Sequence, residues 1–480
     1  MNDIQQSTLP LMLSFKDDIA ITNQDNRVAI QLWKKTISLE HTSTGIRAVL
    51  QALSSGDGAT EQQLVALFKQ HEGESGLPIL FYSVQKWIQL GMICHTVFWQ
   101  EVKLATLIPL TATAPFSSLK PSDNQRYLLS RFAYLHQEGE QWILESPLAH
   151  SKMVLHDGRA MALLHTLAKP INPSGLCRQF PDISTTVVSS LLTLLLGDHY
   201  LSTVDEKGQI DETQTLAQWE FHDLLFHARS RQGRHANRHG ADHIFQGHIE
   251  PLPVVKPPMS NQVIGLYKPD IERLKNNDVP FTRVLEQRCS IREPGEPPIT
   301  VKQLGEFLYR TARVREIIKA EQRPYERSNR PYPSGGASYE MELYIIVNHC
   351  EGLAAGLYHY SPNEHTLEKL TDRTPELETL LKSAYYATAE YGLPQTLIIL
   401  AARFQRVMWR YNSMAYTAIL KHVGVLFQNM YLVATGMGLA PCAVGGGDSD
   451  LFAAVAETDY YAETSVGEFI LSSRATKSKL

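Results

Sequence analysis

Three short segments in the second half of this 480-residue sequence could bind an anionic, flat ligand. In Arg288-Cys289-Ser290-Ile291-Arg292, two guanidinium groups flank a hydroxyl, and we expect a helix to follow. Guanidinium forks, a hydroxyl and backbone N–H groups can together bind a phosphate. RPYPSGGAS (330–338) and GGGD (445–448) carry glycines, whose bare backbone allows close approach to a ligand. Each segment alone is a weak signal, and together they predict a phosphate clamp and two glycine-lined walls of a pocket.

Other binding motifs receive no support. The sequence contains neither the GxxxxGK[ST] loop of a Walker A site nor the GxGxxG dinucleotide fingerprint. Six histidines lie between Trp219 and Pro258, and His235, His239 and His243 follow an i, i+4 spacing. No carboxylate or cysteine frames them at a metal-ligand spacing, and four nearby arginines would repel a cation. We therefore expect no metal site and interpret this stretch as a polar connector.

The elements that must position the three segments form an α/β pattern from about residue 271 onward. Short apolar runs predict strands, and i, i+3, i+4, i+7 spacing predicts helices. His422, Gln428 and Asn429 fall on or beside the apolar face of the last helix, where we expect buried polar residues with satisfied hydrogen bonds. The expected strands cover 342–347, 357–360 and 395–401, and the expected helices cover 301–309, 375–386 and 411–436.

The first half contains a quasi-repeat whose copies begin at Trp33 and Trp142. Each copy predicts helices and then an extended stretch, in the order of a winged helix, with the clearest helices at 45–53, 79–90, 158–167 and 185–196. Winged helices bind DNA or hold an extended peptide beside a strand. The third helix of the first copy has one lysine and that of the second has none, so peptide or partner binding is favoured over DNA binding.

Composition excludes several classes of protein. Lys+Arg number 45 against 50 Asp+Glu, a net charge of −5, which does not suit a strongly basic nucleic-acid binder. No apolar run reaches the ~18 residues of a membrane span, and the first residues predict no signal peptide. Five scattered cysteines without a CxxC disfavour a disulfide framework or a cysteine zinc site. We expect a cytoplasmic protein with reduced thiols.

Domain boundaries follow from these patterns. The proline-rich PLPVVKPP (251–258) predicts an extended, semi-rigid linker. We expect winged-helix-like domains at 1–115 and 116–215, the second suited to peptide binding, a linker segment at 216–270 and a ligand-binding domain at 271–480.

The same segments resemble one known family, in the same order along the chain. RCSIRE, RPYPSGGASYEMELYIIV, GLAAGLYHYSPNEHTLEKL and KHVGVLFQNMYLVATGMGLAPCAVGGGD are similar to SagB-type dehydrogenases of the nitroreductase-like flavoprotein superfamily. The upstream LSRFAYLHQEGEQWILESPLAHSKMVLHDGRA and WEFHDLLFHARSRQGRH resemble the leader half of longer members, and the layout resembles cyanobactin thiazoline oxidases. The resemblance implies an α+β fold: two winged-helix-like domains, then a dimeric nitroreductase-like FMN domain with a mixed sheet.

The resemblance also implies FMN held between the subunits of a homodimer. It implies oxidation of thiazolines or oxazolines to azoles in a ribosomally made peptide. Because the sequence lacks the GxGxxG dinucleotide fingerprint, we expect O₂ to be the electron acceptor. By motif match, the phosphate or ribityl chain would contact Arg288, Ser290 and Arg292, with a weaker assignment to Arg474. The isoalloxazine would lie along Pro333, Ser334 and Gly335, with Gly445 and Gly446 facing its other side.

The reactive pair departs from the family pattern. The family has a Lys-Tyr dipeptide at the start of the long helix, and here the pair is Arg410-Tyr411. A lysine can exchange a proton, whereas an arginine effectively cannot. We therefore expect Arg410 to supply charge or hydrogen bonds and Tyr411 or a nearby group to accept the proton. A tyrosine base needs a neighbouring cation, but residues i and i+1 do not share a helix face, so this contact requires an irregular helix start.

Three alternatives remain. An NAD(P)H-dependent nitroreductase acting on small electrophiles would have no use for the long N-terminal half. A catalytically silent, peptide-binding scaffold subunit would explain the change from lysine to arginine. A DNA-binding regulator with a ligand-sensing domain is disfavoured by the low basicity.

Overall fold

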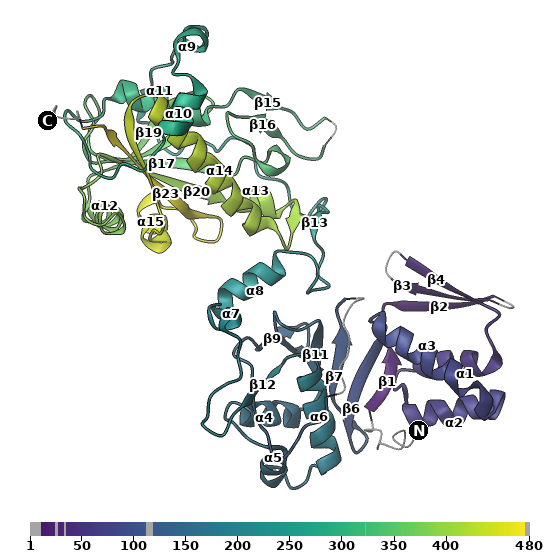
Figure 1. Cartoon of the computed structure of the whole chain (residues 1–480). Helices are drawn as coiled ribbons and strands as arrows, with labels where there is room; N and C mark the ends of the chain where they lie inside the picture. The colour runs from purple at the N-terminus through teal and green to yellow at the C-terminus, as the bar shows by residue number, and fades with distance from the viewer. Residues whose placement is uncertain (1–10, 25–26, 33–34, 112–118, 322, 476–480) are drawn as a thin grey trace. The chain divides into compact units, whose positions relative to one another are not determined.

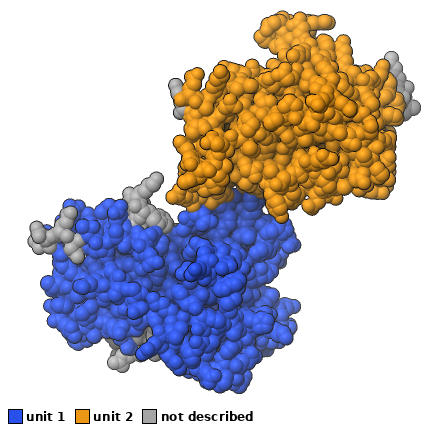
Figure 2. Space-filling model, turned by 180° about the vertical axis from the view of Figure 1, so that it is seen from behind, with its two compact units in different colours: residues 1–237 blue, residues 238–480 orange. Residues whose placement is uncertain are grey.

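The computed structural model describes residues 11–24, 27–32, 35–111, 119–321 and 323–475. The chain divides into two compact units, residues 1–237 and residues 238–480, coloured separately in Figure 2. Among the described residues, no helix combines the length and the apolar character that crossing a membrane requires.

The first unit is built on one seven-stranded sheet with the order β5-β1-β6-β7-β11-β10-β9. Its helices begin at side-chain caps: Ser43 accepts from the Ile46 N–H at the start of α1, and Thr60 and Gln63 form a capping box on α2. Its helices are α1 (Thr44–Leu53), α2 (Glu61–Glu72), α3 (Leu77–Gln89), α4 (Gly158–Thr166), α5 (Pro173–Gln179), α6 (Thr185–Gly197), α7 (Gln214–Ala217) and α8 (Phe221–Arg229). Its strands are β1 (Leu11–Phe15), β2 (Ile19–Gln24), β3 (Arg27–Leu32), β4 (Lys35–Glu40), β5 (Ala59–Thr60), β6 (Ile93–Trp99), β7 (Val102–Pro109), β8 (Arg126–Leu129), β9 (Tyr134–Glu138), β10 (Gln141–Glu145), β11 (Ser151–Leu155) and β12 (Leu201–Val204).

The two copies of the quasi-repeat each have the expected order of three helices followed by a strand. The helices expected at 45–53, 79–90, 158–167 and 185–196 are confirmed as α1, α3, α4 and α6. The copies are joined because β7 pairs with β11 in an antiparallel register from Ser151↔Pro109 to Leu155↔Ala105. The sheet therefore continues from one copy into the other. One apolar core lies within the first copy, whereas the core of the second copy also includes Val97, Leu104 and Leu107 from β6 and β7.

The second unit is a seven-stranded sheet, order β14-β19-β18-β17-β20-β23-β22, between two layers of helices (Figure 1). Side chains of β17 alternate between the layers: Leu343 and Ile345 pack with α11 and α14, whereas Tyr344 and Ile346 pack with α12 and α15. Its helices are α9 (Ile271–Asn277), α10 (Phe281–Gln287), α11 (Val301–Ala312), α12 (Pro375–Ala387), α13 (Gln405–Met408), α14 (Ala415–Gly436) and α15 (Ser449–Ala456). Its strands are β13 (Gly240–Ala241), β14 (Val263–Gly265), β15 (Glu316–Ile318), β16 (Arg327–Asn329), β17 (Met341–Val347), β18 (Gly356–Ser361), β19 (Thr366–Asp372), β20 (Thr396–Arg403), β21 (Tyr411–Asn412), β22 (Leu439–Val444) and β23 (Glu463–Ser473).

Two details of this unit differ from expectation. The neighbouring strands of its seven-stranded sheet all pair antiparallel in the described residues, where we expected a mixed sheet. The long helix begins at Ala415 and not at Tyr411. Tyr411 and Asn412 are extended because they pair with Ala241 and Gly240, and Ser413 then adopts a φ of 58°. The Arg410-Tyr411 pair therefore precedes the helix.

The segment that we expected to be a linker, 216–270, divides between the units. In its first part, α8 is fixed within the first unit, where Arg229 pairs with Glu145. From residue 238 on, the chain is part of the second unit, although we expected the boundary in the proline-rich stretch. That stretch, called the strap below, is held to the second unit by its non-proline residues: Leu252 O accepts from Arg406, and the Lys256 ammonium pairs with Glu463.

Candidate active site

The glycine-containing loop 333–338 has an unusual backbone. It connects β16 to β17, and Gly336, Ala337 and the nearby Tyr339 have φ values of 65°, 56° and 47°. Non-glycine residues rarely adopt such angles and do so mainly where the surroundings enforce them. Within the loop, Ser334 Oγ accepts from the Tyr339 N–H at 3.0 Å, and Ser338 Oγ donates to the Gly335 carbonyl at 2.9 Å.

Three side chains from the α13–α14 region bind this loop from outside. The Gly335 N–H donates to His422 Nε2 at 2.7 Å, and Arg410 Nη1 donates to the Gly336 carbonyl at 3.1 Å. Arg406 donates from Nη2 to the Ser338 carbonyl at 2.8 Å. Arg406 is 5% exposed, and burial lowers its pKa to about 10. The loop conformation is therefore set by groups more than sixty residues away in sequence.

The expected reactive pair lies directly against the loop. A Cβ added at Gly336 would fall 1.7 Å from Arg410 Nη1, and one added at Gly335 would fall 3.6 Å from the Tyr411 hydroxyl and 3.2 Å from His422 Nε2. Arg410 lies over the Tyr411 ring at 4.9 Å and also bonds the Tyr325 hydroxyl. The contact between Arg410 and Tyr411 is possible because neither residue is in the helix.

The expected anion clamp follows a helix instead of preceding one. Arg288 comes directly after α10, and the next helix along the chain, α11, begins only at Val301, so the clamp does not lead directly into a helix. Ser290 Oγ lies 2.7 Å from the Tyr431 hydroxyl, and Arg288 lies over the Tyr431 ring at 5.4 Å. Arg292 is exposed, and its positive charge acts on Cys442, whose pKa burial nevertheless raises. The three clamp residues thus gather at the C-terminal part of α14 and the start of β22.

The remaining expected ligand contacts lie on other elements. Gly445 and Gly446 form an exposed turn between β22 and α15, and a Cβ at either would meet nothing within 4 Å. Arg474 is exposed and follows β23 directly. It lies beside Gly295, since a Cβ added at Gly295 would fall 2.4 Å from the Arg474 carbonyl carbon. Arg474 therefore lies near the segment that follows Arg292.

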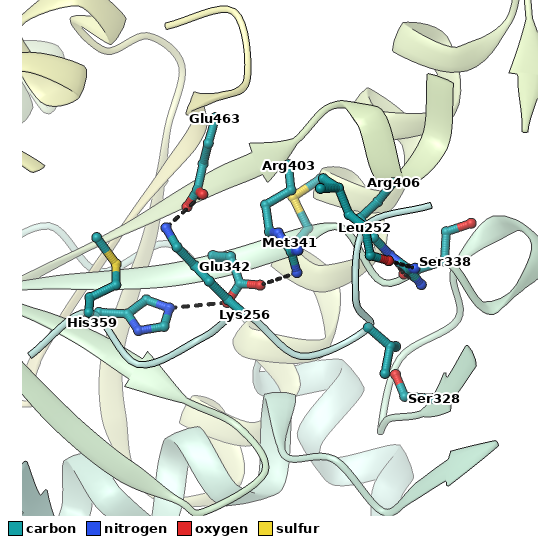
Figure 3. Close-up of polar contacts among 12 residues, drawn as sticks. Leu252, Lys256, Ser328, Ser338, Met341, Glu342, His359, Arg403, Arg406 and Glu463 are labelled. Atoms are coloured by element: carbon teal, nitrogen blue, oxygen red, sulfur yellow. Dashed lines mark hydrogen bonds and ion pairs between the residues drawn. The ribbon is translucent and has the colours of Figure 1, made fainter. Parts of the chain in front are cut away.

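A cluster of buried charges fixes the strap to the sheet (Figure 3). His359, 1% exposed, bonds Glu342 at 3.1 Å and Glu368 at 3.0 Å, and Lys256 bonds Glu463 at 2.7 Å. Burial opposes protonation of His359, but its hydrogen bonds to the two carboxylates outweigh it and raise its pKa. Burial raises the pKa of Glu342, but the hydrogen bond and charge of His359 outweigh it, so the net pKa is lowered.

Sequence reasoning missed the partners of the loop. It placed His422 among satisfied buried polar residues, which is confirmed, but gave no link to the loop. Glu340 lies inside one of the quoted segments but was given no role, and Tyr325 lies outside all of them. The available signal was a histidine on the apolar face of the long helix, near the Arg-Tyr pair that precedes it.

Three family descriptions match consecutive parts of this chain. Residues 285–467 match the nitroreductase family, residues 127–236 match the cyanobactin oxidase ThcOx, and residues 7–118 match the ThcOx helix-turn-helix domain. A Methanocaldococcus jannaschii protein named as a nitroreductase is 31% identical over 180 residues, 37% of this chain and 81% of the relative. The chain belongs to the nitroreductase family, and its first half is similar to the domains described for the cyanobactin oxidase ThcOx. The expected resemblance to nitroreductase-like proteins with a cyanobactin-oxidase layout is confirmed. The expected α+β fold with an N-terminal helix-turn-helix domain is confirmed, and so is the expectation of an oxidoreductase of this family.

Two further relatives are named for peptide processing. The microcin B17-processing protein McbC of Escherichia coli is 32% identical over 115 residues, 23% of this chain and 42% of the relative. The trifolitoxin-processing protein TfxB of Rhizobium leguminosarum bv. trifolii is 25% identical over 149 residues, 30% of this chain and 40% of the relative. The matched parts are therefore less than half of either relative.

Proposed function

We propose that this protein is an FMN-dependent oxidase that converts thiazoline or oxazoline rings of a ribosomally made peptide to thiazoles or oxazoles. One combination carries the proposal: ThcOx-type sequence at 127–236 is joined to a nitroreductase-family unit whose bare-backbone loop packs against Arg410 and Tyr411. The names of the two peptide-processing relatives support a peptide substrate.

The residues present fit FMN. Arg288, Ser290 and Arg292 are a cationic, hydroxyl-bearing group suited to a phosphate. Gly335 has no side chain to keep a flat ring away from the loop. The buried Nε of Arg410 has no hydrogen-bond partner among the described residues, which suits a polar edge of a bound ring. Pro333 and Ser334 would line the same ring, Gly445 and Gly446 would face its other side, and Arg474 would add a phosphate contact. When bound, FMN supplies the acceptor for the hydride equivalent.

The positions of the loop and the clamp on α14 support a homodimer. His422, against the loop, and Tyr431, against the clamp, are nine residues apart, which is two and a half helical turns at 3.6 residues per turn. They therefore face opposite sides of α14, so one chain presents loop and clamp in different directions. A second copy would bring the loop of one subunit to the clamp of the other. Exposed apolar side chains on α10 and α14 suit such an interface: Phe281, Leu285, Tyr416, Leu420 and Val425.

In the proposed reaction, Tyr411 accepts the ring proton and Arg410 places a positive charge beside it. The guanidinium over the Tyr411 ring, at 4.9 Å, supports this division of roles, because arginine cannot itself exchange the proton. The first unit holds the peptide. On α3, Ile79 and Tyr82 are 61% and 65% exposed one turn apart, and they offer apolar contacts beside the sheet.

The first experiment is the visible absorption spectrum of the purified full-length protein, with the released chromophore identified by mass. Bound FMN near one per chain is the expected result, and a protein that stays colourless after addition of FMN contradicts the proposal. The second experiment incubates the FMN-loaded protein, in air, with a thiazoline-containing peptide. We expect the peptide mass to fall by two hydrogen atoms.

Two controls separate the alternative functions. Steady oxidation of NAD(P)H with a small nitroaromatic compound, and no change in the peptide, would favour a nitroreductase. Capture of the peptide without any mass change, in a protein that binds FMN, would favour the scaffold subunit. Substitution of Ile79 and Tyr82 by serine is expected to raise KM for the peptide with kcat unchanged, because neither residue contacts the reacting ring.

A further inference from the structure

Glu340 and His422 form a buried pair against the 333–338 loop. His422 Nδ1 lies 2.6 Å from Glu340 Oε1, and the two residues are 8% and 0% exposed. The second oxygen of Glu340 accepts from Ser334 Oγ at 3.3 Å. The carboxylate thus reaches the loop twice, directly at Ser334 and through the imidazole at Gly335.

The hydrogen bonds define the histidine tautomer. The Gly335 N–H can only donate, so His422 Nε2 accepts and carries no proton. The ring proton is therefore on Nδ1, where it donates to Glu340. Glu340 consequently fixes both the orientation of the ring and the nitrogen that faces the loop.

The loop needs this restraint because its conformation is strained. Ala337 and Tyr339 are non-glycine residues with positive φ. Loss of the acceptor at Gly335 would leave its N–H unpaired and would free the peptide group next to Gly336. An ordered loop binds a rigid ligand with a smaller entropic loss than a mobile one.

We propose that His422 and Glu340 are positioning residues that lock the Gly335 amide and so preorganise the 333–338 loop for the flat ring of FMN. This inference rests on the proposed function, in which the loop lies along that ring. The structure offers an internal comparison in His359, a second buried histidine held by glutamates, which bonds to the sheet and not to the loop.

The test measures FMN affinity of the full-length protein by quenching of flavin fluorescence, in four variants. His422→Leu removes both hydrogen bonds and is expected to weaken FMN binding about ten-fold, which corresponds to about 1.4 kcal/mol. His422→Asn keeps a donor for Glu340 but is too short to reach Gly335, and should weaken binding similarly. His422→Gln keeps the reach and an acceptor, and should recover most of the affinity. His359→Leu should lower the melting temperature while the folded protein keeps wild-type affinity.

Each outcome decides between a positioning and a merely structural role. Wild-type affinity and an unshifted flavin spectrum in His422→Asn would overturn the proposal, and this polar variant serves if the leucine variant does not fold. Failure of His422→Gln to recover affinity would also overturn it, as would an equal loss of affinity in His359→Leu. A wild-type protein that binds no FMN defeats the proposed function itself. Normal FMN binding and peptide oxidation with insensitive His422 variants would defeat only this inference.

Discussion

A methyl group added at Gly336 should disturb the candidate site through Arg410. In Gly336→Ala, the new carbon would fall 1.7 Å from Arg410 Nη1 and 2.4 Å from its Cζ, so the guanidinium must move. Movement breaks its hydrogen bonds to the Gly336 carbonyl and to the Tyr325 hydroxyl. Gly336 also has a φ of 65°, which a residue with a side chain adopts only with strain.

The loss of unfolding free energy in Gly336→Ala has two parts, and a second glycine with a similar φ allows one part to be measured alone. Gly438 has a nearly equal φ of 70°, and a Cβ there meets nothing within 4 Å. Gly438→Ala should therefore show the backbone strain alone, about 1–2 kcal/mol of unfolding free energy. Gly336→Ala adds the loss of a hydrogen bond from a charged group, about 1.5–3 kcal/mol, for a total of about 2.5–5 kcal/mol.

Urea denaturation of the full-length variants in a double-mutant cycle tests this account. In an Arg410→Ala background the obstructing guanidinium is gone, so Gly336→Ala should cost only as much as Gly438→Ala. The losses of unfolding free energy caused by Gly336→Ala and Arg410→Ala should then be less than additive, with a coupling of about 1.5–3 kcal/mol. Strict additivity would refute the placement of Arg410 against Gly336.

Three further predictions concern neighbouring groups. Tyr411→Phe should reduce the rate of peptide oxidation about 10²–10⁴-fold. FMN affinity should stay unchanged, because strand pairing holds the backbone of residue 411 without the hydroxyl. An unchanged kcat for peptide oxidation would exclude Tyr411 as the proton acceptor. Arg406→Met leaves three carbonyls without their donor and should cost at least about 3 kcal/mol in urea denaturation, whereas Arg373→Met, in an exposed ion pair, should stay within about 1 kcal/mol. His359 has a pKa raised above 6.5, so it stabilises the fold most below pH 6.5 and less as pH rises through its folded-state pKa. The difference in melting temperature between wild type and His359→Gln should therefore shrink as pH rises. A difference that stays constant with pH would contradict this account.

Local pattern was sufficient for most of the elements. The helices at 158–167 and 185–196 follow from apolar spacing, and caps such as Ser184, which accepts from the Val187 N–H, mark their starts. The apolar run of β17 predicted a strand although both of its faces are buried. The pairing of β7 with β11 escaped prediction, because strand neighbours far apart in sequence leave no periodic signal in either strand.

The candidate site could likewise be predicted from sequence only in part. Segments with adjacent glycines can be recognised in the sequence itself, because a glycine leaves the backbone without a side chain wherever it occurs. The segments that contain glycines 335, 336, 445 and 446 could therefore be selected from sequence. The distant groups that hold the 333–338 loop could not, because they act over long separations: His422 on Gly335 across 87 residues, and Arg410 on Gly336 across 74. The start of α14 was misplaced for this reason, since β13 holds Tyr411 and Asn412 extended where their own sequence permits a helix.

These contacts also give a physical reason for an arginine at position 410. Its guanidinium bonds the Gly336 carbonyl and the Tyr325 hydroxyl while lying over the rings of Tyr325 and Tyr411 at 5.3 and 4.9 Å. A planar, charged fork can stack and donate at the same time, whereas an ammonium is a compact point charge. Arg410→Lys should therefore loosen the 333–338 loop even though it restores a side chain able to exchange a proton. If peptide oxidation falls in that variant while FMN binding weakens with it, positioning of the loop is the main role of Arg410. If oxidation rises at unchanged FMN affinity, proton exchange limits the reaction, and Tyr411 alone is an inefficient acceptor.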